Sequence, residues 1–476
     1  MGSVNSSGEP RLVIASNRLP LSVKKTDGKY DVTPSSGGLV SALRGLKTAK
    51  FLWLGWPGLA VDPSHRDRVD EQLAKEHAAA VYLDEDLAKD HYNGFSNAIL
   101  WPILHYQAGK SMTPTVWEAY RRVNEIFAES VSNEARDGDL IWVHDYHLFL
   151  LPQMLRDRLK AQGKRCPIGF FLHTPFPADD YWRGLPFEED LLQGVLGSDV
   201  IGFHTDEYKK NFVASCDVLL GSVQVTNDHL RYKDRMIKTG RYIAGIDVGR
   251  FTRTLEDRKV QARIKELESL YKGKKVIIGV DRLDYTKGLT EKMEGYRIFL
   301  DEHPELRDKV ILVQIAIPSR EDVKEYQDLE GEVSKSVGQI IGKHATPHST
   351  PLLYIHRSVS FEDLTALYAI SDVCFLTSRR DGLNLVASEY VACQDRRHGV
   401  LVLSKFTGAA SFLSHGSVLC NPSSAEGLSE SLYQAITMDE EDRKNRHNAL
   451  RDFVTTHSSE KWTKSFLDDL EKYRVQ

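Results

Sequence analysis

The feature that most limits the fold is a repeated pairing of a short apolar run with a helical pattern. In the first half of the chain, apolar runs occur at 11–16, 51–58, 139–144, 168–172 and 200–203. Helical patterns lie between them at 114–128, 148–162 and 185–197. Near-continuous apolar strands are typical of a parallel sheet that is covered on both faces. The alternation therefore predicts an α/β fold.

The same pattern starts again in the second half. The pattern is interrupted near 241–251, and a charged helix is expected at 257–270. Further apolar runs then follow at 274–280, 309–318, 351–355, 372–378 and 400–404. A chain of 476 residues is too long for one hydrophobic core. We therefore predict two domains, 1–245 and 246–476. The last amphipathic helix, about 456–476, is a candidate for packing back on the N-terminal domain.

Composition excludes several classes of protein. A net charge of −5 gives no general attraction to nucleic acid or to an acidic membrane. No run reaches the roughly 18 apolar residues of a membrane helix, and the start lacks an apolar signal core. The start fits the loose Met-Gly-x-x-x-Ser acylation pattern, but no basic cluster follows it. Five scattered cysteines favour free thiols in a reducing compartment, so we expect a cytoplasmic protein.

One strand–turn–helix, at 377–389, has the composition of a sugar-nucleotide site. Gly382 allows close approach to the backbone, and the N–H groups of residues 382–385, which include Leu383 and Asn384, open a helix at Leu385. Such groups form an anion site. Asp381 and Glu389 are then placed to accept hydrogen bonds from hydroxyls on either side of a phosphate. An ordinary strand–turn–helix with a capping Asp remains the alternative.

Polar residues follow several strands of the first half. Arg18, Asp145, His173 and His204 come at the ends of four apolar runs. In open parallel sheets, ligands bind beyond the carboxyl ends of the strands. We therefore expect these side chains to point towards one crevice.

Two cations follow the first strand of the second half. Arg282 and Lys287 lie on one short loop that opens a helix at Gly288. Two cations and helix-end N–H groups are suited to neutralising a pyrophosphate leaving group, whose charge grows as the bond breaks. A surface charge pair is the alternative. A second phosphate site is expected at Arg18, Tyr92 and Arg320.

Other segments are less informative. The aromatic stretch 81–102 shows little periodicity, so we expect a structured loop. The glycine pair before residue 39 is a weak phosphate-loop signal. The sequence has no G-x-G-x-x-G after its first strand and no Walker A motif, which argues against a dehydrogenase and a P-loop enzyme. His144 and His147 lack an evident further metal ligand, so we expect solvated histidines at a strand end.

Together these motifs resemble the α,α-trehalose-phosphate synthases (UDP-forming), retaining glycosyltransferases of the GT-B type. The resemblance covers nearly the whole chain. It rests on the motifs Ser-Asn-Arg-Leu-Pro at 16–20, Ser-Gly-Gly at 36–38, Trp-Leu-Gly-Trp-Pro-Gly at 53–58, Val-His-Asp-Tyr-His at 143–147, Phe-Leu-His-Thr-Pro-Phe-Pro at 171–177, Asp-Arg-Leu-Asp-Tyr-Thr-Lys-Gly at 281–288 and Ser-Arg-Arg-Asp-Gly-Leu-Asn-Leu at 378–385. It implies two Rossmann-like domains whose parallel sheets face across a cleft, the first for the acceptor and the second for the donor.

The resemblance also implies a reaction and a set of roles. Glucose passes from UDP-glucose to glucose 6-phosphate with retained configuration and without a metal. The donor residues are Gly38 in a closing loop, Arg282 and Lys287 on the pyrophosphate, Asp381 and residues 382–385 on glucose and phosphate, and Glu389 on the ribose. The acceptor phosphate is held by Arg18, Tyr92, Trp101 and Arg320, while Asp145 and His173 orient hydroxyls near the reacting carbon.

Several alternatives stay open at this stage. Retention is compatible with a double displacement through a carboxylate such as Asp145 or Asp381, or with attack from the leaving-group face, which the resemblance favours. Another nucleotide sugar or acceptor would need the same cations. A regulatory subunit that binds sugar phosphates without turnover would be expected to lose Arg282, Lys287, Asp381 or Glu389, and all four are present. A homo-oligomer and a complex with a trehalose-phosphate phosphatase subunit are implied by resemblance.

Overall fold

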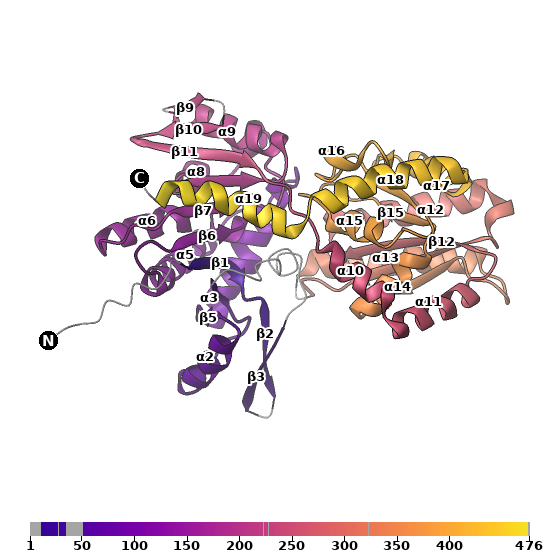
Figure 1. The fold of residues 1–476 in the computed structure, drawn as a ribbon, viewed down its shortest axis with the longest axis horizontal. Coiled ribbons are helices and arrows are strands. Elements are labelled where there is room, and N and C mark those ends of the chain that lie inside the picture. Colours follow the sequence, from indigo (N-terminus) through magenta and orange to yellow (C-terminus); the bar gives the residue numbers. More distant parts are fainter. Residues whose placement is uncertain are drawn as a thin grey trace. The chain divides into compact units, whose positions relative to one another are not determined.

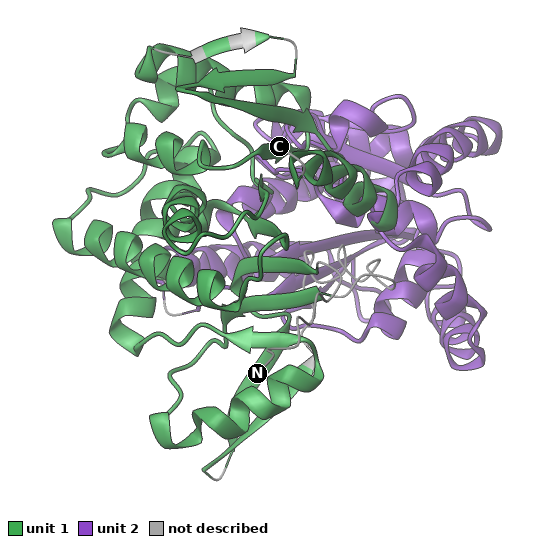
Figure 2. Cartoon of the chain, turned by 60° about the vertical axis from the view of Figure 1, so that its left-hand side comes forward, with its two compact units in different colours: residues 1–243, 460–476 green, residues 244–459 purple. Residues whose placement is uncertain are grey.

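The protein was analysed as a computed structural model that describes residues 11–474, apart from residue 27, residues 35–50, and residues 222, 227 and 322. The chain forms two compact units (Figure 2): unit 1 comprises Met1–Ile243 with Glu460–Gln476, and unit 2 comprises Ala244–Ser459. The division after Ile243 lies close to the expected boundary near Gly245. The last helix belongs to unit 1.

Unit 1 is built on a nine-stranded sheet in the order β5-β4-β1-β6-β7-β8-β11-β10-β9 (Figure 1). Its strands are β1 (Leu12–Arg18), β4 (Phe51–Trp56), β5 (Ala78–Ala80), β6 (Leu140–His144), β7 (Ile168–Phe171), β8 (Val200–Phe203), β9 (Val223–Thr226), β10 (His229–Tyr232) and β11 (Arg235–Arg241). A separate hairpin pairs β2 (Leu21–Thr26) with β3 (Lys29–Pro34).

The strands from β5 to β11 pair in parallel, as predicted. The edge differs, because β10 pairs antiparallel with both β11 and β9. Only Lys233 and Asp234 connect β10 to β11. A link this short permits only an antiparallel neighbour, since a parallel crossover needs a dozen or more residues.

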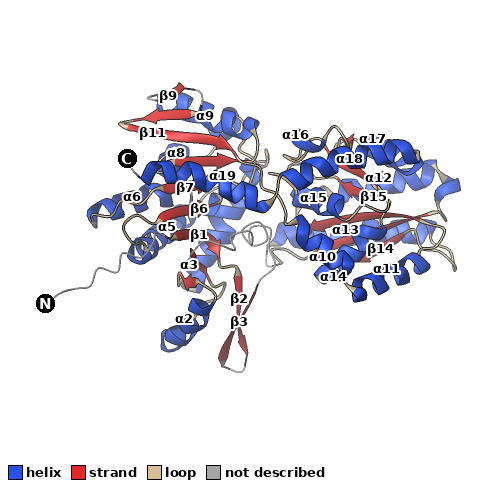
Figure 3. Ribbon diagram, viewed as in Figure 1, coloured by secondary structure: helices blue, strands red, loops and turns tan. Residues whose placement is uncertain are grey.

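Helices alternate with the strands of unit 1 (Figure 3). They are η1 (Pro63–His65), α2 (Arg66–Lys75), α3 (Glu85–Lys89), η2 (Asp90–Leu100), α4 (Trp101–Leu104), α5 (Pro114–Glu134), η3 (Tyr146–Leu148), α6 (Leu151–Ala161), α7 (Asp179–Trp182), α8 (Glu188–Val195), α9 (Asp206–Leu220), α19 (Ser459–Glu471, whose first residue is in unit 2) and η6 (Lys472–Arg474).

The aromatic stretch 81–102 was wrongly expected to be a loop. It contains α3, then η2, which is a π-helix, then α4. A π-helix closes its hydrogen bonds five residues apart, so its buried residues do not recur with the 3.6-residue period of an α-helix. That is why the stretch showed little periodicity.

The C-terminal helix α19 covers one face of the unit 1 sheet. Phe466 stacks on Trp142, with ring centroids 4.5 Å apart. Side chains at Gly169 and Gly202 would collide with the ring of Phe466, so the two glycines leave room for it. On the opposite face, Phe170 packs on Phe149, just before α6. Both faces of the sheet are therefore buried.

Unit 2 is built on a six-stranded parallel sheet in the order β14-β13-β12-β15-β16-β17. Its strands are β12 (Lys275–Arg282), β13 (Val310–Ile317), β14 (Leu352–Ile355), β15 (Val373–Leu376), β16 (Val400–Ser404) and β17 (Val418–Cys420). Its helices are α10 (Val248–Glu256), α11 (Arg258–Leu270), η4 (Tyr285–Lys287), α12 (Leu289–Glu302), η5 (Pro304–Leu306), α13 (Lys324–His344), α14 (Phe361–Ile370), α15 (Leu385–Ala392), α16 (Ala410–Leu413), α17 (Ala425–Thr437) and α18 (Glu440–Thr456).

The core of unit 2 lies on both faces of this sheet. Phe375 of β15 shares one cluster with residues of α12, α13 and α17, among them Phe299. The neighbouring Cys374 points to the other face, where it lies near Tyr368 of α14 and Tyr390 of α15. This alternation is the period of two expected for a strand between two helical layers.

Both links between the units leave unit 2 at one place. Ile246 forms a parallel bridge with Ser458. An added side chain at Gly245 would meet the carbonyl oxygen of His457. The chain therefore enters and leaves unit 2 along adjacent backbone segments.

Candidate functional site

The loop after β12 is shaped by one buried carboxylate. Asp284 Oδ1 accepts hydrogen bonds from Thr286 N at 3.0 Å and from Thr286 Oγ1 at 2.9 Å. The carbonyl oxygen of Asp284 also accepts from Lys287 N at 2.9 Å. Asp is a favoured residue for capping such a turn. The turn places Lys287 five residues beyond Arg282, the last residue of β12, at the carboxyl edge of the sheet.

Gly288 lets this loop pack against the loop that follows β15. Its φ is +63°, and an added Cβ would collide with the carbonyl oxygen of Thr377. Thr377 Oγ1 donates to Gly288 O at 3.0 Å, and Arg379 N donates to Thr286 O at 2.8 Å. The two loops are therefore joined backbone to backbone.

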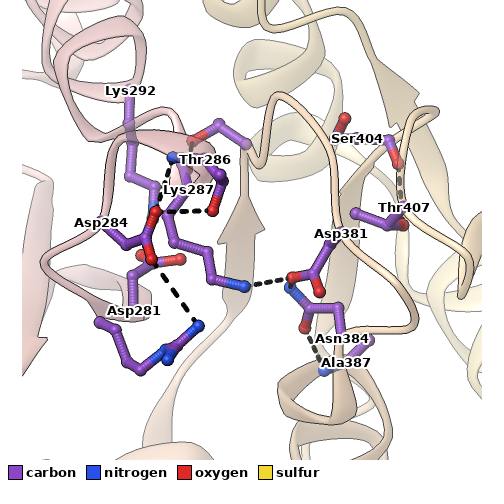
Figure 4. A network of polar contacts seen from close by, with 12 residues as sticks. Asp281, Asp284, Thr286, Lys287, Lys292, Asp381, Asn384, Ala387, Ser404 and Thr407 are labelled. Atoms are coloured by element: carbon purple, nitrogen blue, oxygen red, sulfur yellow. Dashed lines mark hydrogen bonds and ion pairs between the residues drawn. The ribbon is translucent and has the colours of Figure 1, made fainter. Parts of the chain in front are cut away.

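Asp381 pairs with the cation of the neighbouring loop. Lys287 Nζ lies 2.5 Å from Asp381 Oδ2, and Asn384 Nδ2 donates to the same oxygen at 3.2 Å (Figure 4). Asn384, with φ +75°, caps α15 by accepting from Ala387 N at 3.3 Å. The helix cap is therefore Asn384, and the carboxylate of Asp381 pairs with Lys287 instead.

A third loop, after β16, closes against the same segment. Gly408 N donates to Asp381 O at 2.9 Å, and Ala409 N donates to Leu383 O at 2.8 Å. An added Cβ at Gly408 would collide with Gly382 O. The loops after three adjacent strands, β12, β15 and β16, thus meet at one edge, where ligands bind in open α/β sheets.

The predicted phosphate ligand Arg320 lies in this same group. It follows β13, its φ is +53°, and its side chain is 4% exposed. Its Nη1 lies 3.4 Å from Asp284 Oδ2 and also contacts the hydroxyl of Tyr326. Arg282 Nη2 lies 3.8 Å from the same carboxylate oxygen. Burial alone would raise the pKa of Asp284, but Arg320 and Arg282 outweigh it and lower that pKa to about 2.

Glu389 lies one turn into α15 and contacts a different helix. Its Oε2 accepts a hydrogen bond from the hydroxyl of Tyr368 at 3.1 Å. Burial raises the pKa of Glu389, while the bond from Tyr368 and the charge of Arg250 oppose the rise.

A buried polar cluster supports β12 beneath the loop. Lys292 Nζ lies 2.5 Å from Asp281 Oδ2, and Gln314 completes the cluster with bonds to both at 3.1 Å. The Lys292 and Asp281 side chains are 0% and 1% exposed. A buried pair is tolerated when further hydrogen bonds satisfy it, as they do here.

In unit 1, β1, β6, β7 and β8 are neighbours, so their carboxyl ends share one edge. Asp145 has φ +74°. Its N–H donates to Phe171 O at 2.8 Å, and its Oδ1 accepts from His173 N at 3.2 Å. His144 Nδ1 and His173 Nε2 lie 3.1 Å apart. The structure thus brings Asp145 and His173 together.

The expectation of solvated histidines at this strand end is wrong for His144, which is fully buried. Burial lowers its pKa to about 3. The pKa of His173 lies well below its usual value, first because of burial and then because of His144 and His204. These rings are therefore held in the neutral form.

Arg18, the last residue of β1, lies beside aromatic residues of unit 1. The guanidinium of Arg18 lies 4.7 Å from the ring centre of Trp56, and it interacts electrostatically with Tyr92. Tyr92 stacks on His147. Trp101 is buried, with its ring 4.1 Å from that of His105. The predicted acceptor residues are divided, since Arg320 belongs to unit 2.

Gly38 and its loop lie outside the described residues. Among the residues that the structure describes, no group of three or more His, Cys, Asp or Glu side chains is placed to hold a metal ion. Within the same part of the chain, no helix is long and apolar enough to cross a membrane.

Sequence reasoning missed the carboxylate between the arginines. In the sequence, Asp284 is one residue of the motif at 281–288, and no pattern marks Tyr326. The Asp-x-Thr spacing at 284–286 is a local capping signal that points to Asp284. Nothing in the sequence shows that Arg320, 36 residues later, meets the same oxygen.

Two units, each built on a largely parallel sheet, are the architecture of a GT-B glycosyltransferase. The chain belongs to glycosyltransferase family 20, whose family model matches residues 10–472. The α,α-trehalose-phosphate synthase [UDP-forming] 2 of Aspergillus niger is 48% identical, with 98% of each chain covered. The corresponding Schizosaccharomyces pombe enzyme is 45% identical, with 98% of this chain and 92% of its own length covered.

Solved structures agree with this assignment. A synthase of the same name from Burkholderia xenovorans, in complex with glucose-6-phosphate, has a TM-score of 0.84 at 31% identity, covering 97% of this chain and all of its own. A trehalose-6-phosphate structure from E. coli bound with UDP-2-fluoro glucose has a TM-score of 0.86 at 32% identity, covering 97% and 99%. The N-terminal domain of a Candida albicans trehalose-6-phosphate phosphatase has a TM-score of 0.88 at 28% identity, and the match covers 99% of this chain and 98% of that domain.

Proposed function

We propose that the chain transfers glucose from UDP-glucose to glucose 6-phosphate, producing α,α-trehalose 6-phosphate and UDP. This is the first step of trehalose biosynthesis. The observation that carries the proposal is the group of Arg282, Lys287 and Asp381 at the carboxyl edge of unit 2, in a chain of glycosyltransferase family 20. A fold shared with a phosphatase domain does not by itself identify a transferase.

The proposed donor roles are those that the resemblance to trehalose-phosphate synthases implies. Arg282 and Lys287 bind the pyrophosphate, and Asp381 with the amides of residues 382–385 binds glucose and phosphate. Glu389 accepts hydrogen bonds from the ribose hydroxyls, and Gly38 belongs to a loop that closes over the donor. Two cations beside a leaving phosphate lower the energy of the charge that develops as the glycosidic bond breaks.

The proposed acceptor roles concern the phosphate and the hydroxyls of glucose 6-phosphate. Arg18, Tyr92, Trp101 and Arg320 bind the phosphate of glucose 6-phosphate. Asp145 and His173 orient hydroxyls near the reacting carbon, and the hydrogen bond from the main-chain N–H of His173 to Asp145 Oδ1 keeps the two residues together. A neutral His173 ring is suited to accepting or donating one hydrogen bond without adding charge.

The stereochemical course proposed is attack from the leaving-group face. The bond from the anomeric carbon to the donor phosphate oxygen breaks, and a bond to the acceptor hydroxyl oxygen forms on the same face. The acceptor proton passes to the departing phosphate oxygen, so the products are UDP and the disaccharide phosphate. A glucosyl adduct trapped on Asp145 would instead establish a double displacement.

The proposed transfer needs no metal, because Arg282 and Lys287 supply the positive charge that a cation supplies in other nucleotide enzymes. We expect the rate of UDP formation to change by less than about twofold after dialysis against EDTA. A loss of activity that Mg²⁺ or Mn²⁺ restores would contradict this.

The decisive experiment measures UDP release from UDP-glucose with and without glucose 6-phosphate, and identifies the sugar product. UDP that depends on the acceptor, together with a non-reducing disaccharide phosphate, supports the proposal. GDP-glucose and other sugar phosphates serve as controls for the choice of nucleotide and acceptor. Binding of glucose 6-phosphate without turnover of either donor would favour a regulatory subunit. This alternative is considered because the phosphatase domain has the same fold.

The cellular setting is part of the same proposal. We place the enzyme in the cytoplasm, where both substrates are expected, and we expect a homo-oligomer that associates with a trehalose-phosphate phosphatase subunit. Size-exclusion chromatography with light scattering tests the first association. Co-purification with the phosphatase from the native organism tests the second.

A further inference from the structure

We propose that Asp284 is a positioning residue for the transfer reaction, because its single buried carboxylate aligns Arg282 and Arg320 together. The inference rests on the proposed function. It assigns a role to a residue that does not itself touch the substrate. Asp284 would link the cation at the leaving group to the cation at the acceptor phosphate.

The two carboxylate oxygens of Asp284 have different partners. Oδ1 accepts from the backbone N–H and the hydroxyl of Thr286, at 3.0 and 2.9 Å, and so holds the turn. Oδ2 faces Arg320 at 3.4 Å, Arg282 at 3.8 Å and the hydroxyl of Tyr326 at 3.4 Å. The capping role and the alignment role are therefore separable by substitution.

The charges around Asp284 support the alignment role. Lys287 has a carboxylate partner of its own in Asp381, while Arg282 and Arg320 share Asp284. The Arg320 side chain is 4% exposed and the Asp284 side chain 0%, so water screens this group poorly. The lowered pKa of Asp284 keeps the carboxylate ionised throughout the physiological pH range. Without that charge, the half-exposed Arg282 loses an attraction that holds it on the same side as Arg320.

Loss of the carboxylate should therefore affect turnover more than ground-state binding. Replacing Asp284 with Asn adds one net positive charge to the site, which continues to attract a diphosphate. The arginines lose their common partner, however, and charge that develops only in the transition state is stabilised by preorganised groups.

The first test compares Asp284→Asn with the wild type. Asn keeps the shape and the Oδ1 acceptor for Thr286 but removes the negative charge. We expect kcat for UDP formation to fall by at least about tenfold, while Kd for UDP, measured by calorimetry, changes by less than about threefold.

Thr286→Val is the matched control, because it removes the hydroxyl donor to Oδ1 and leaves the carboxylate in place. We expect its kcat to stay within about twofold of the wild type. If kcat, UDP affinity and thermal stability fall in parallel in both variants, Asp284 is a cap only and the proposal is wrong. A kcat for Asp284→Asn within about threefold of the wild type also overturns it.

A second variant covers a failure of Asp284→Asn to fold. Tyr326→Phe removes only the hydroxyl that bridges Arg320 and Asp284. It should lower kcat a few-fold without changing UDP affinity. A wild-type kcat for Tyr326→Phe, with an unfolded Asp284→Asn, would count against alignment.

A spectroscopic readout separates this inference from the proposed function. In protein labelled with ¹⁵N-arginine, the Nε–Hε resonance of the buried Arg320 should shift or broaden in Asp284→Asn and stay in place in Thr286→Val. Arg320→Lys assigns the resonance. If the wild type lacks turnover, the proposed function fails on its own assay. An unchanged Arg320 resonance in Asp284→Asn overturns the alignment role whatever the activity.

Discussion

The cations of the candidate donor site are held by carboxylates of the protein itself. Lys287 pairs with Asp381, and Arg282 lies beside Asp284. A phosphate that binds here enters a set of charges that is already oriented, so little reorganisation is needed when its negative charge grows. The same pairing means that the phosphate competes with Asp381 for Lys287.

Replacing Arg282 with Ala should lower kcat on the order of a hundredfold, because one preorganised charge at the leaving group is removed. The Arg282 side chain is 44% exposed, so its loss should leave the melting temperature nearly unchanged. Steady-state UDP release provides the measurement.

Arg297→Ala is the control for this variant. Arg297 forms ion pairs with Glu294 and Asp301 on α12, and exposed helix pairs contribute about 0.3–0.5 kcal/mol. Its kcat should equal that of the wild type. If Arg282→Ala also retains full kcat, the loop does not meet the pyrophosphate.

Buried histidines predict a loss of stability in mild acid. Burial lowers the pKa of His91 to about 4 and that of His144 to about 3, against 6.5 as the usual value. As pH falls below 6.5 the unfolded chain takes up protons that the folded state refuses. The stability from these two residues is therefore full above pH 6.5 and declines towards pH 4. At pH 5 the loss should be about 2 kcal/mol for each histidine.

Urea unfolding between pH 5 and pH 8 measures this loss. His91→Gln is the informative variant, since Gln does not titrate and retains a donor for the carbonyl oxygen of His147. Its free energy of unfolding should depend less steeply on pH than that of the wild type. Equal slopes for the two proteins would mean that His91 carries its proton in the folded state.

At the scale of elements, the site depends on backbone contacts between loops. The loop from β12 to α12 approaches the loop after β15 so closely that Gly288 has no room for a side chain. That approach places Lys287 against Asp381. The geometry of the ion pair is thus set by the packing of the main chains. Substituting Lys287 or Asp381 would not reveal this dependence.

Gly288→Ala should therefore impair both stability and turnover. The left-handed backbone alone costs roughly 1–2 kcal/mol for a residue with a Cβ, and the collision with Thr377 O adds to it. We expect a lower melting temperature, together with a reduced kcat, because the loop that carries Lys287 is displaced. Gly331→Ala, in the middle of α13 with open space around the new Cβ, should instead stabilise by about 0.5–1 kcal/mol. A functional Gly288→Ala with unchanged stability would contradict the close packing.

The sequence predicted correctly those elements whose residue pattern fits a single type of secondary structure. Buried parallel strands such as β6, β7 and β13 were recognised because an apolar run in an α/β pattern has few other uses. The helix at 90–100 was missed, since its π geometry has no α-helical period. The antiparallel edge at β9 and β10 was missed as well, because its short strands carry no long apolar run.

The candidate site was predictable to a similar extent. Residues at or just beyond strand ends, such as Arg282 and Asp381, were placed at the sheet edge from position alone. The shared use of Asp284 was not, because it depends on Arg320, which the fold brings from the next strand. The spacing of residues along the chain indicates which residues share one loop. Which charged residues of different loops form pairs depends on the order of the strands in the sheet.

At the scale of the whole molecule, unit 1 is assembled from both ends of the chain. Residues 460–474 return to it as α19 and η6, and Tyr242 donates a hydrogen bond to Asp469 at 2.8 Å. Phe466 is fully buried against Trp142. The sheet of unit 1 therefore lacks part of its cover until the last helix is in place.

Phe466→Ala should destabilise unit 1 by about 3–5 kcal/mol, the usual cost of removing a buried aromatic side chain. Hydrogen exchange followed by mass spectrometry should show faster exchange in β6, β7 and β8. Phe299→Ala, in the core of unit 2, is the counterpart and should speed exchange in β12 and β13. Uniform loss of protection in Phe466→Ala, with no preference for unit 1, would contradict the assignment of α19.

The return of the chain to unit 1 also sets an order of events on the ribosome. Residues 244–459 must be synthesised before the segment that covers Trp142 emerges, which takes about 10–45 s at roughly 5–20 residues per second. During that interval unit 2 can complete its core, while the apolar surface of the unit 1 sheet that α19 later covers stays exposed. A chaperone that holds nascent chains should therefore bind residues 140–203 for longer than any segment of unit 2.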